Sequence, residues 1–221
     1  MKNIFLLIAW TSLFLPSYGK VQLYLGLHGG GGVMLTRDQL NNLATPPGYV
    51  NATRSTSGWS LHAKAEALIG FKRLRIGYQF LYNFSQPSIS NSSYSTFINE
   101  NQNATYFNNS RNNFFGHYFL AEYAIINSKH FALTPGLALG SFTGYKVDNN
   151  TGERVELSTD THHRFSLGAS LNIEIKFGRL VFLAGPNYYL FTLQDRTNHD
   201  WRESQQFIGG DIGLRFNLLK P

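Results

Sequence analysis

Charged and amide side chains recur at alternate positions within otherwise apolar segments of this sequence. The set consists of Lys64, Glu66, Arg75, Gln79, Glu122, Arg164, Glu174, Lys176, Asp211 and Arg215. Because successive residues of a β-strand point to opposite faces, this spacing places the set on one common face. Buried charges must be paired and hydrogen-bonded. We therefore predict an enclosed network of ion pairs; the alternative is a narrow ion pathway.

Other residue groups with possible chemistry give weaker patterns. His162, His163 and Asp160 could form a surface metal site, but adjacent strand residues point to opposite faces and a further spaced ligand is not evident. The run Gly29–Gly32 lacks the Lys and Ser/Thr of a phosphate-binding loop and predicts a bent strand end instead. The sequence has no cysteine, which excludes disulfides and thiolate sites. We predict no metal and no cofactor.

The elements that must position these residues are β-strands. Between 74 and 84, and between 164 and 177, apolar residues alternate with polar or small ones, whereas a helix would scramble both sets. Weaker alternation appears in six more places. The predicted strands are 21–33, 58–71, 74–84, 114–126, 131–143, 164–177, 180–193 and 205–218. Each is at least about as long as the roughly 9–11 residues that a tilted strand needs to cross a bilayer.

The connections between these strands alternate between long and short. The long polar connections are 34–57, 85–113, 144–161 and 194–204, and the tight turns are at 72–73, 127–129 and 178–179. Short turns on one side and long loops on the other are typical of outer-membrane barrels. The fold class we predict is all-β: an eight-stranded antiparallel up-and-down transmembrane β-barrel with four long extracellular loops and three short periplasmic turns.

A soluble barrel of the lipocalin kind is the alternative reading of the same alternation. Charged residues make up only 14% of the chain, which is sparse for a water-exposed surface, and aromatic residues make up 15%. Aromatic residues that flank the apolar faces, as an interfacial girdle would, are Trp59, Phe71, Phe84, Phe115, Phe131, Phe165 and Phe177. These features favour the membrane version. Pro135 and Pro186 fall inside predicted strands, where we expect local bulges.

The composition and the N-terminus bear on partners and location. The formal charge is +6, but the basic residues are scattered singly, so we predict no nucleic-acid partner. Lys2, the apolar run 4–15 and Pro16 have the form of a cleavable export signal. We therefore expect a signal peptide at 1–19 and a mature barrel at 20–221; a retained membrane anchor is the alternative.

The segment from Asp211 to Leu218 resembles the insertion signal of bacterial outer-membrane barrels. Asp211, Gly213, Phe216 and Leu218 match its spacing of a polar residue, a glycine and two hydrophobic residues, although three residues follow here. With the loop asymmetry, the chain resembles the small eight-stranded families: the transmembrane domain of outer membrane protein A, the X/Ail type and the "porin family" barrels. The resemblance implies a monomer in the bacterial outer membrane, inserted by the barrel-assembly machinery and surrounded by lipid and lipopolysaccharide.

The function we predict is non-enzymatic and resides in the surface loops. The loop 85–113 mixes Asn and Ser with aromatic residues, a composition suited to contact with a host or cell-surface ligand. The contact candidates are Tyr94, Phe97, Tyr106 and Phe107. The loops could instead support envelope integrity, and solvated loop variation with no specific partner is the alternative. Two alternatives stay open. One is a small porin. The other is a lipid A deacylase or acyltransferase, although no histidine of this sequence is followed two positions later by a serine, as in the His-x-Ser arrangement of such deacylases.

Overall fold

The computed structural model describes residues 21–42, 50–88, 110–148, 152, 154–157, 162–195 and 201–219. The expected signal peptide at 1–19 lies outside these residues, so its cleavage stays a prediction. The strands of the described part are β1 (Val21–Asn42), β2 (Val50–Phe71), β3 (Leu74–Ser88), β4 (Ser110–Tyr123), β5 (Ile126–Asn127), β6 (Phe131–Asp148), β7 (Arg154–Leu157), β8 (His162–Phe177), β9 (Leu180–Asp195) and β10 (Trp201–Asn217). No helix in these ranges is long and apolar enough to cross a membrane.

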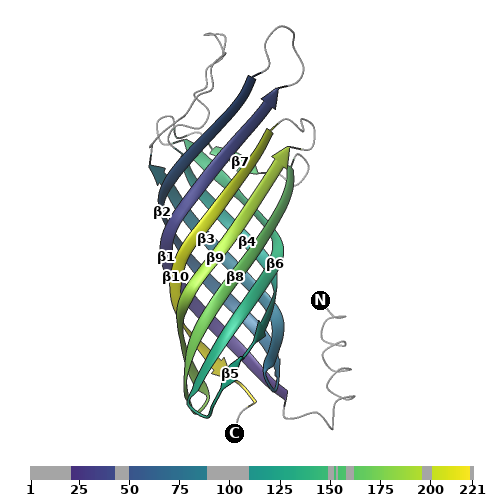
Figure 1. Ribbon diagram of the computed structural model, residues 1–221, viewed down its shortest axis with the longest axis vertical. Helices are drawn as coiled ribbons and strands as arrows, with labels where there is room; N and C mark the ends of the chain where they lie inside the picture. The colour runs from purple at the N-terminus through teal and green to yellow at the C-terminus, as the bar shows by residue number, and fades with distance from the viewer. Residues whose placement is uncertain are drawn as a thin grey trace.

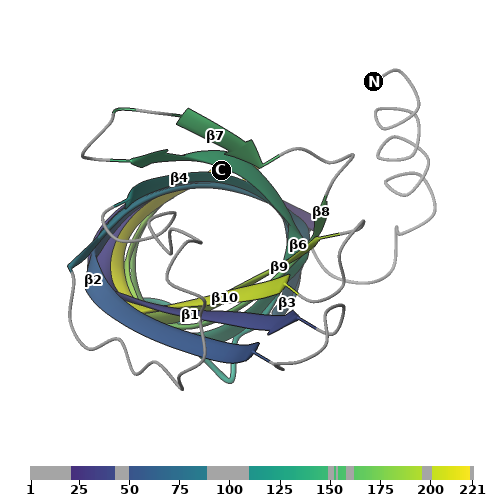
Figure 2. The same cartoon turned by 90° about the horizontal axis from the view of Figure 1, so that it is seen from above.

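Eight of these strands form one closed wall. The hydrogen-bonded order is β4-β3-β2-β1-β10-β9-β8-β6, and a β4–β6 pairing closes the ring. All pairings are antiparallel, and the strands run steeply tilted around a central axis (Figures 1 and 2). The short strands β5 and β7 both pair with β6. The prediction of an eight-stranded antiparallel up-and-down barrel is thus confirmed.

The wall separates the two alternating sets of side chains. Large apolar residues point outward, and Leu137, Leu171, Phe177 and Ile212 are between 40% and 72% exposed. The charged and amide residues between them are buried inside the ring, where Arg215 and Glu174 have no exposed surface. A water-soluble barrel would reverse this arrangement, because exposed apolar area of this extent costs free energy in water. The outer surface is therefore one that lipid chains can cover.

The strands extend beyond their predicted ends on the long-loop side. β1 continues to Asn42 and β2 begins at Val50, because the ladder between them persists to the pair Asn42↔Val50 beyond the apolar alternation. At the other end the turns at 72–73 and 178–179 are as predicted, with Lys72 and Gly178 in the left-handed region (φ 56° and 57°). The predicted bounds of the third turn, 127–129, are wrong. β4 ends at Tyr123, so the connection to β6 occupies 124–130.

The two prolines within strands differ in their effect. Opposite Pro135 the register changes, since Glu122 pairs with Gly136 while Ile126 pairs with Leu133. Three residues of the neighbouring chain thus face two of β6, which is a bulge. Beside Pro186 the β8–β9 ladder is interrupted, but the pairs on either side keep the same register. The expected bulge at Pro186 is therefore wrong. Pro186 keeps its pairing with Gly210 of β10, and the gap in the ladder toward β8 accommodates the missing N–H without an extra residue.

The glycine run lies in the middle of β1 rather than at a strand end. Gly31 and Gly32 face Gly210 and Gly209 of β10. A Cβ atom on Gly32 would lie 2.2 Å from the carbonyl oxygen of Ile208, closer than any side chain tolerates. The run therefore permits a close β1–β10 approach at the seam where the first and last strands close the wall.

Candidate functional site

The lumen contains a cluster of five charged residues, here called the arginine layer: Glu66, Arg75, Glu122, Glu174 and Arg215. The Arg215 guanidinium is fully buried and reaches three carboxylates. Its Nη2 donates to Glu122 Oε1 at 3.0 Å, its Nη1 to Glu174 Oε1 at 3.2 Å, and its Nε to Glu66 Oε1. A planar guanidinium suits this role because its five N–H groups diverge in one plane.

Arg75 of β3 completes the arginine layer. Its Nη2 donates to Glu174 Oε2 at 2.8 Å, and its Nη1 also contacts Glu174 and lies 3.4 Å from Glu122 Oε2. The Tyr24 ring lies beneath both arginines, with guanidinium carbons 4.9 Å and 5.9 Å from its centroid. Each carboxylate of the layer therefore faces at least one arginine, as an enclosed charge requires.

A second group of charges, the lysine layer, consists of His28, His62, Lys64 and Asp211. Lys64 forms an ion pair with Asp211, and His62 Nε2 lies 3.8 Å from the same carboxylate. His28 Nε2 lies 3.1 Å from Glu66 Oε1 and so joins the two layers. All four residues are under 9% exposed.

Above the lysine layer, toward the long loops, aromatic side chains occupy the lumen. This aromatic layer consists of Phe114, Phe142, Tyr189, Phe191 and Phe207. Phe191 of β9 packs across the lumen against two rings. Its ring centroid lies 5.5 Å from that of Phe114 on β4 and 5.3 Å from that of Phe142 on β6. Phe207 contacts His62 edge-on at 5.0 Å. The layer is buried, so an apolar barrier lies over the charges.

Sequence reasoning missed the aromatic layer. The alternation places Phe114, Tyr189, Phe191 and Phe207 in the set of positions that faces the lumen. The alternation of inward and outward positions along each strand could have revealed these rings. Leu81, an apolar residue at an inward position of β3, gave the same indication that apolar side chains enter the lumen. A narrow eight-stranded lumen must be filled by side chains of some kind, and rings fill it without needing partners.

The remaining residues of the predicted polar set lie at different heights. Gln79 donates from Nε2 to the Tyr189 hydroxyl at 2.8 Å, and so connects the aromatic layer to β3. Lys176 lies at the short-turn mouth, where its Nζ donates to Asn127 and, at 3.2 Å, to the Ser128 carbonyl. Arg164 is half-buried on β8 near the long-loop end, apart from the arginine layer.

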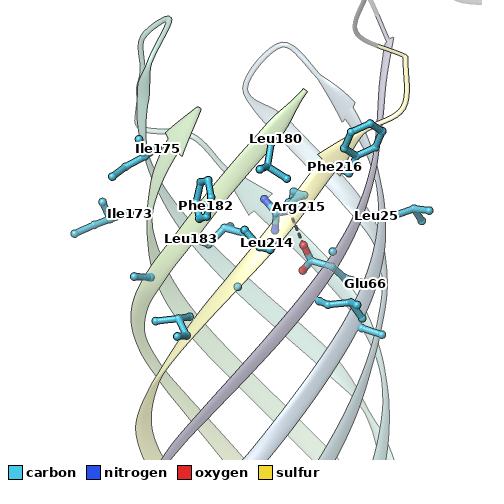
Figure 3. Close-up of a pocket in the computed structure, with 16 residues that line it drawn as sticks. Leu25, Glu66, Ile173, Ile175, Leu180, Phe182, Leu183, Leu214, Arg215 and Phe216 are labelled. Carbon is cyan, nitrogen blue, oxygen red and sulfur yellow. Dashed lines mark hydrogen bonds and ion pairs between the residues drawn. The ribbon is translucent and has the colours of Figure 1, made fainter. Parts of the chain in front are cut away.

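The residues of the predicted insertion signal divide between the two faces of β10. Asp211 is buried in the lumen, and a Cβ on Gly213 would lie 2.7 Å from the His28 ring, so this glycine makes room for that ring. Phe216 is 40% exposed on the outer face, and Leu218, just after the end of β10, is also 40% exposed. Figure 3 shows Phe216, Leu25 and Phe182 around an apolar groove of the outer wall, with the Arg215–Glu66 pair behind them.

The outward face of β3 and β4 carries a polar pair within the apolar surface. The Tyr78 hydroxyl hydrogen-bonds His117 Nδ1, and the His117 ring packs edge-on against Phe80 at 5.4 Å. Ser141 of β6 lies opposite His117 in the strand register. This is a histidine at the lipid-facing surface with a serine on the next strand.

The loop and metal candidates from the sequence have little structural counterpart. Tyr94, Phe97, Tyr106 and Phe107 lie outside the described residues. His162 and His163 pair with Asp195 and Gln194 in the β8–β9 ladder, and Asp160 lies outside the described residues. Among the described ranges, no group of three His, Asp or Glu side chains is arranged to hold a metal ion.

Several solved outer-membrane barrels are similar to this chain at low identity. Neisserial surface protein A is 12% identical, with 90% of this chain and 100% of that chain covered and a TM-score of 0.48. The attachment invasion locus protein Ail of Yersinia pestis is 12% identical, with 87% and 98% covered and a TM-score of 0.33. The outer membrane protease OmpT of Escherichia coli is 9% identical, with 89% and 97% covered and a TM-score of 0.46.

No protein-family model and no curated protein sequence matches the chain. The similarities above concern strand arrangement and assign no activity to any residue. The closed wall, the apolar exterior and the charged, ring-filled lumen are features of the chain itself. In architecture, the chain is a small eight-stranded β-barrel of the outer-membrane type.

Proposed function

We propose that this chain is a non-enzymatic barrel of the bacterial outer membrane whose wall is a rigid scaffold for its long loops. The observation that carries the proposal is the filled lumen. Carboxylates are paired with basic side chains in the arginine layer near the short-turn end and in the lysine layer above it, and the aromatic layer lies between both layers and the long-loop end. A lumen blocked in this way offers no aqueous route, so the working surfaces are the two ends and the outer wall.

The partners in this proposal follow from those surfaces. The apolar exterior contacts membrane lipid and lipopolysaccharide, and the insertion signal ending at Phe216 and Leu218 is read by the barrel-assembly machinery. The chain acts as a monomer. The long loops, with Tyr94, Phe97, Tyr106 and Phe107, bind a host or cell-surface ligand or stabilise the envelope. A signal peptide at 1–19 delivers the chain to the outer membrane.

A loop exchange tests the role of the surface loops. Residues 89–109 are replaced by a Gly/Ser linker, and cells that express either form are applied to arrays of immobilised glycans and extracellular-matrix proteins. We expect unchanged barrel folding, seen as the usual gel shift between folded and heated protein, and loss of binding. A variant with only the four aromatic residues changed to Ser distinguishes side-chain contacts from loop length. Equal binding by all three forms would contradict a ligand-binding role for this loop.

Conductance across a planar bilayer tests the plugged lumen. We expect the unmodified protein to be silent and Phe114→Ala/Phe191→Ala to show small openings, because two rings that meet across the lumen are removed. Phe119→Ala, on the outer face of the same strand, is the matched control. Steady openings by the unmodified protein would favour the small-porin alternative.

A second candidate function, lipid modification, is favoured by one observation. His117 faces the lipid side with Tyr78 on its Nδ1 atom, and Ser141 lies opposite on β6. A histidine oriented by a neighbour and close to a serine is the arrangement that activates a hydroxyl nucleophile. Mass spectra of lipid A from cells with the unmodified protein or with His117→Ala decide between the two functions. Identical spectra, equal to those of cells that lack the protein, support the non-enzymatic proposal.

A further inference from the structure

The lumen opens at the short-turn end into a polar pocket of about 230 Å³. Four cationic side chains line it: Lys72, Arg75, Lys129 and Lys176. None of the residues that line it is Asp or Glu. Asn127 and Asn217 add amide groups, so most of the polar atoms around the pocket are hydrogen-bond donors or can act as donors.

Lysines supply three of the four cationic side chains that line this pocket. Arg75 at its inner end already contacts Glu174 and Glu122 of the arginine layer. Both carboxylates also contact Arg215, and neither glutamate lines the pocket. Lys72, Lys129 and Lys176 line the same pocket, and Lys176 also donates to Asn127 and to the Ser128 carbonyl.

The pocket is built on an ordered turn. The backbone of the 124–130 connection is held at both ends, with Ala124 N donating to Arg73 O at 2.8 Å and Lys176 N donating to His130 O at 2.9 Å. Ser128 closes the turn by bonding Phe131 through both its amide and its hydroxyl group. The backbone that carries Asn127 and Lys129 is thus ordered before any ligand arrives, which lowers the entropy cost of binding.

We propose that this mouth is a binding site for a phosphate group. Three ammonium groups, a guanidinium edge and amides that converge on one cavity complement a group with several acceptor oxygens and more than one negative charge. The volume is several times the roughly 30 Å³ that a water molecule occupies in the liquid, enough for one phosphate with a few waters. The site is distinct from the long-loop surface to which the proposed function assigns the ligand.

The phosphate can come from two sources. The short-turn end is where the apolar wall gives way to the headgroup region of the inner leaflet, so an anionic phospholipid can supply its phosphodiester. A soluble phosphate compound on that side of the membrane can supply the same group. Both would meet Lys72 and Lys129, which lie on different turns of the same rim.

Titration of the refolded full-length mature chain with inorganic phosphate and pyrophosphate tests the site. The detergent must be a sugar detergent, because phosphocholine detergents carry the group under test. Backbone amide shifts at 126–130 and 176–179 are followed by nuclear magnetic resonance at constant ionic strength, with chloride as the reference anion. We expect saturable shifts at these amides, and an affinity about tenfold or more lower in each of Lys72→Gln and Lys129→Gln, since each removes a charge-assisted hydrogen bond.

Arg73→Gln and Arg179→Gln are the matched controls, because both residues belong to the same short turns but do not line the pocket. They should keep the affinity of the unmodified chain within about twofold. Equal losses in the lysine and arginine variants would overturn the proposal in favour of diffuse attraction to a basic rim. Absence of saturable shifts, with both soluble phosphates and lipid, would also overturn it.

The two sources are separated in nanodiscs without added phosphate. Shifts of the same amides, relative to the sugar detergent, that are larger in phosphatidylglycerol than in the zwitterionic phosphatidylcholine assign the site to an anionic headgroup. Shifts with soluble phosphate alone assign it to a solute. Either result supports a phosphate site. In both cases the amide shifts must be absent from the Lys129→Gln variant.

Discussion

Replacement of Arg215 by Met should be among the most damaging single changes in the lumen. Met has a comparable length and keeps apolar packing, but it removes the guanidinium that contacts Glu66, Glu122 and Glu174. Removing one partner of a buried ion pair typically costs about 3–5 kcal/mol, because the remaining charge is left buried. Arg75 still faces two of the three carboxylates, so we expect a loss of about 4 kcal/mol rather than a multiple of that value.

The measurement is urea unfolding in lipid vesicles, followed by tryptophan fluorescence, with Trp59 on the outer wall as one reporter. The difference in midpoint at constant slope gives the change in free energy of unfolding. Leu214→Met, on the exposed face of the adjacent position, should change it by less than about 0.5 kcal/mol.

A compensating change sharpens this test. Glu66→Gln added to Arg215→Met removes one of the uncompensated charges and should recover about 1–2 kcal/mol, whereas Glu66→Gln alone should be destabilising. If Arg215→Met proves no worse than Leu214→Met, or if Glu66→Gln fails to rescue it, the lumen charges do not act as one enclosed network.

Two further predictions concern the wall and its turns. Leu171→Arg, on the outer face well above the short turns, should lower the free energy of unfolding in vesicles by about 2–4 kcal/mol. Phe177→Arg, at the turn end, should lower it by at most about 1 kcal/mol, because arginine is tolerated near the membrane interface. Equal costs for the two variants would contradict the placement of the wall in the bilayer. Lys72→Gly should raise the free energy of unfolding by about 1 kcal/mol and Gly178→Val should lower it by about 1–2 kcal/mol, since both positions have positive φ. Urea midpoints check this pair, and changes of the same sign in both variants would refute it.

The fold could be predicted because one physical rule governs each wall strand. A residue on a barrel strand faces either lipid or lumen, so the alternation around Leu171 and Glu174 fixes orientation residue by residue. The alternation of long and short connections then gives the up-and-down order. The strand ends near Asn42 and Val50 were missed because the hydrogen-bonded ladder continues where side chains no longer alternate between two solvents.

The contents of the lumen were harder to predict in detail. Parity identifies Arg215 as inward but cannot say that it meets Glu66, Glu122 and Glu174, since these lie on β2, β4 and β8 and their heights depend on strand tilt and stagger. The proposed phosphate site was also outside reach, because Lys72 and Lys129 belong to different turns and the sequence does not show that the β3–β4 register places both at one pocket.

Spin labelling along β8 measures the central claim most directly, namely that apolar positions face lipid and polar positions are enclosed. The chain has no cysteine, so each single-cysteine variant from position 170 to 175 carries one nitroxide. In vesicles, collision with oxygen should be high at 171, 173 and 175 and low at 170, 172 and 174, a strict period of two. The reverse phase, or uniform accessibility to a water-soluble nickel complex along the strand, would contradict the account.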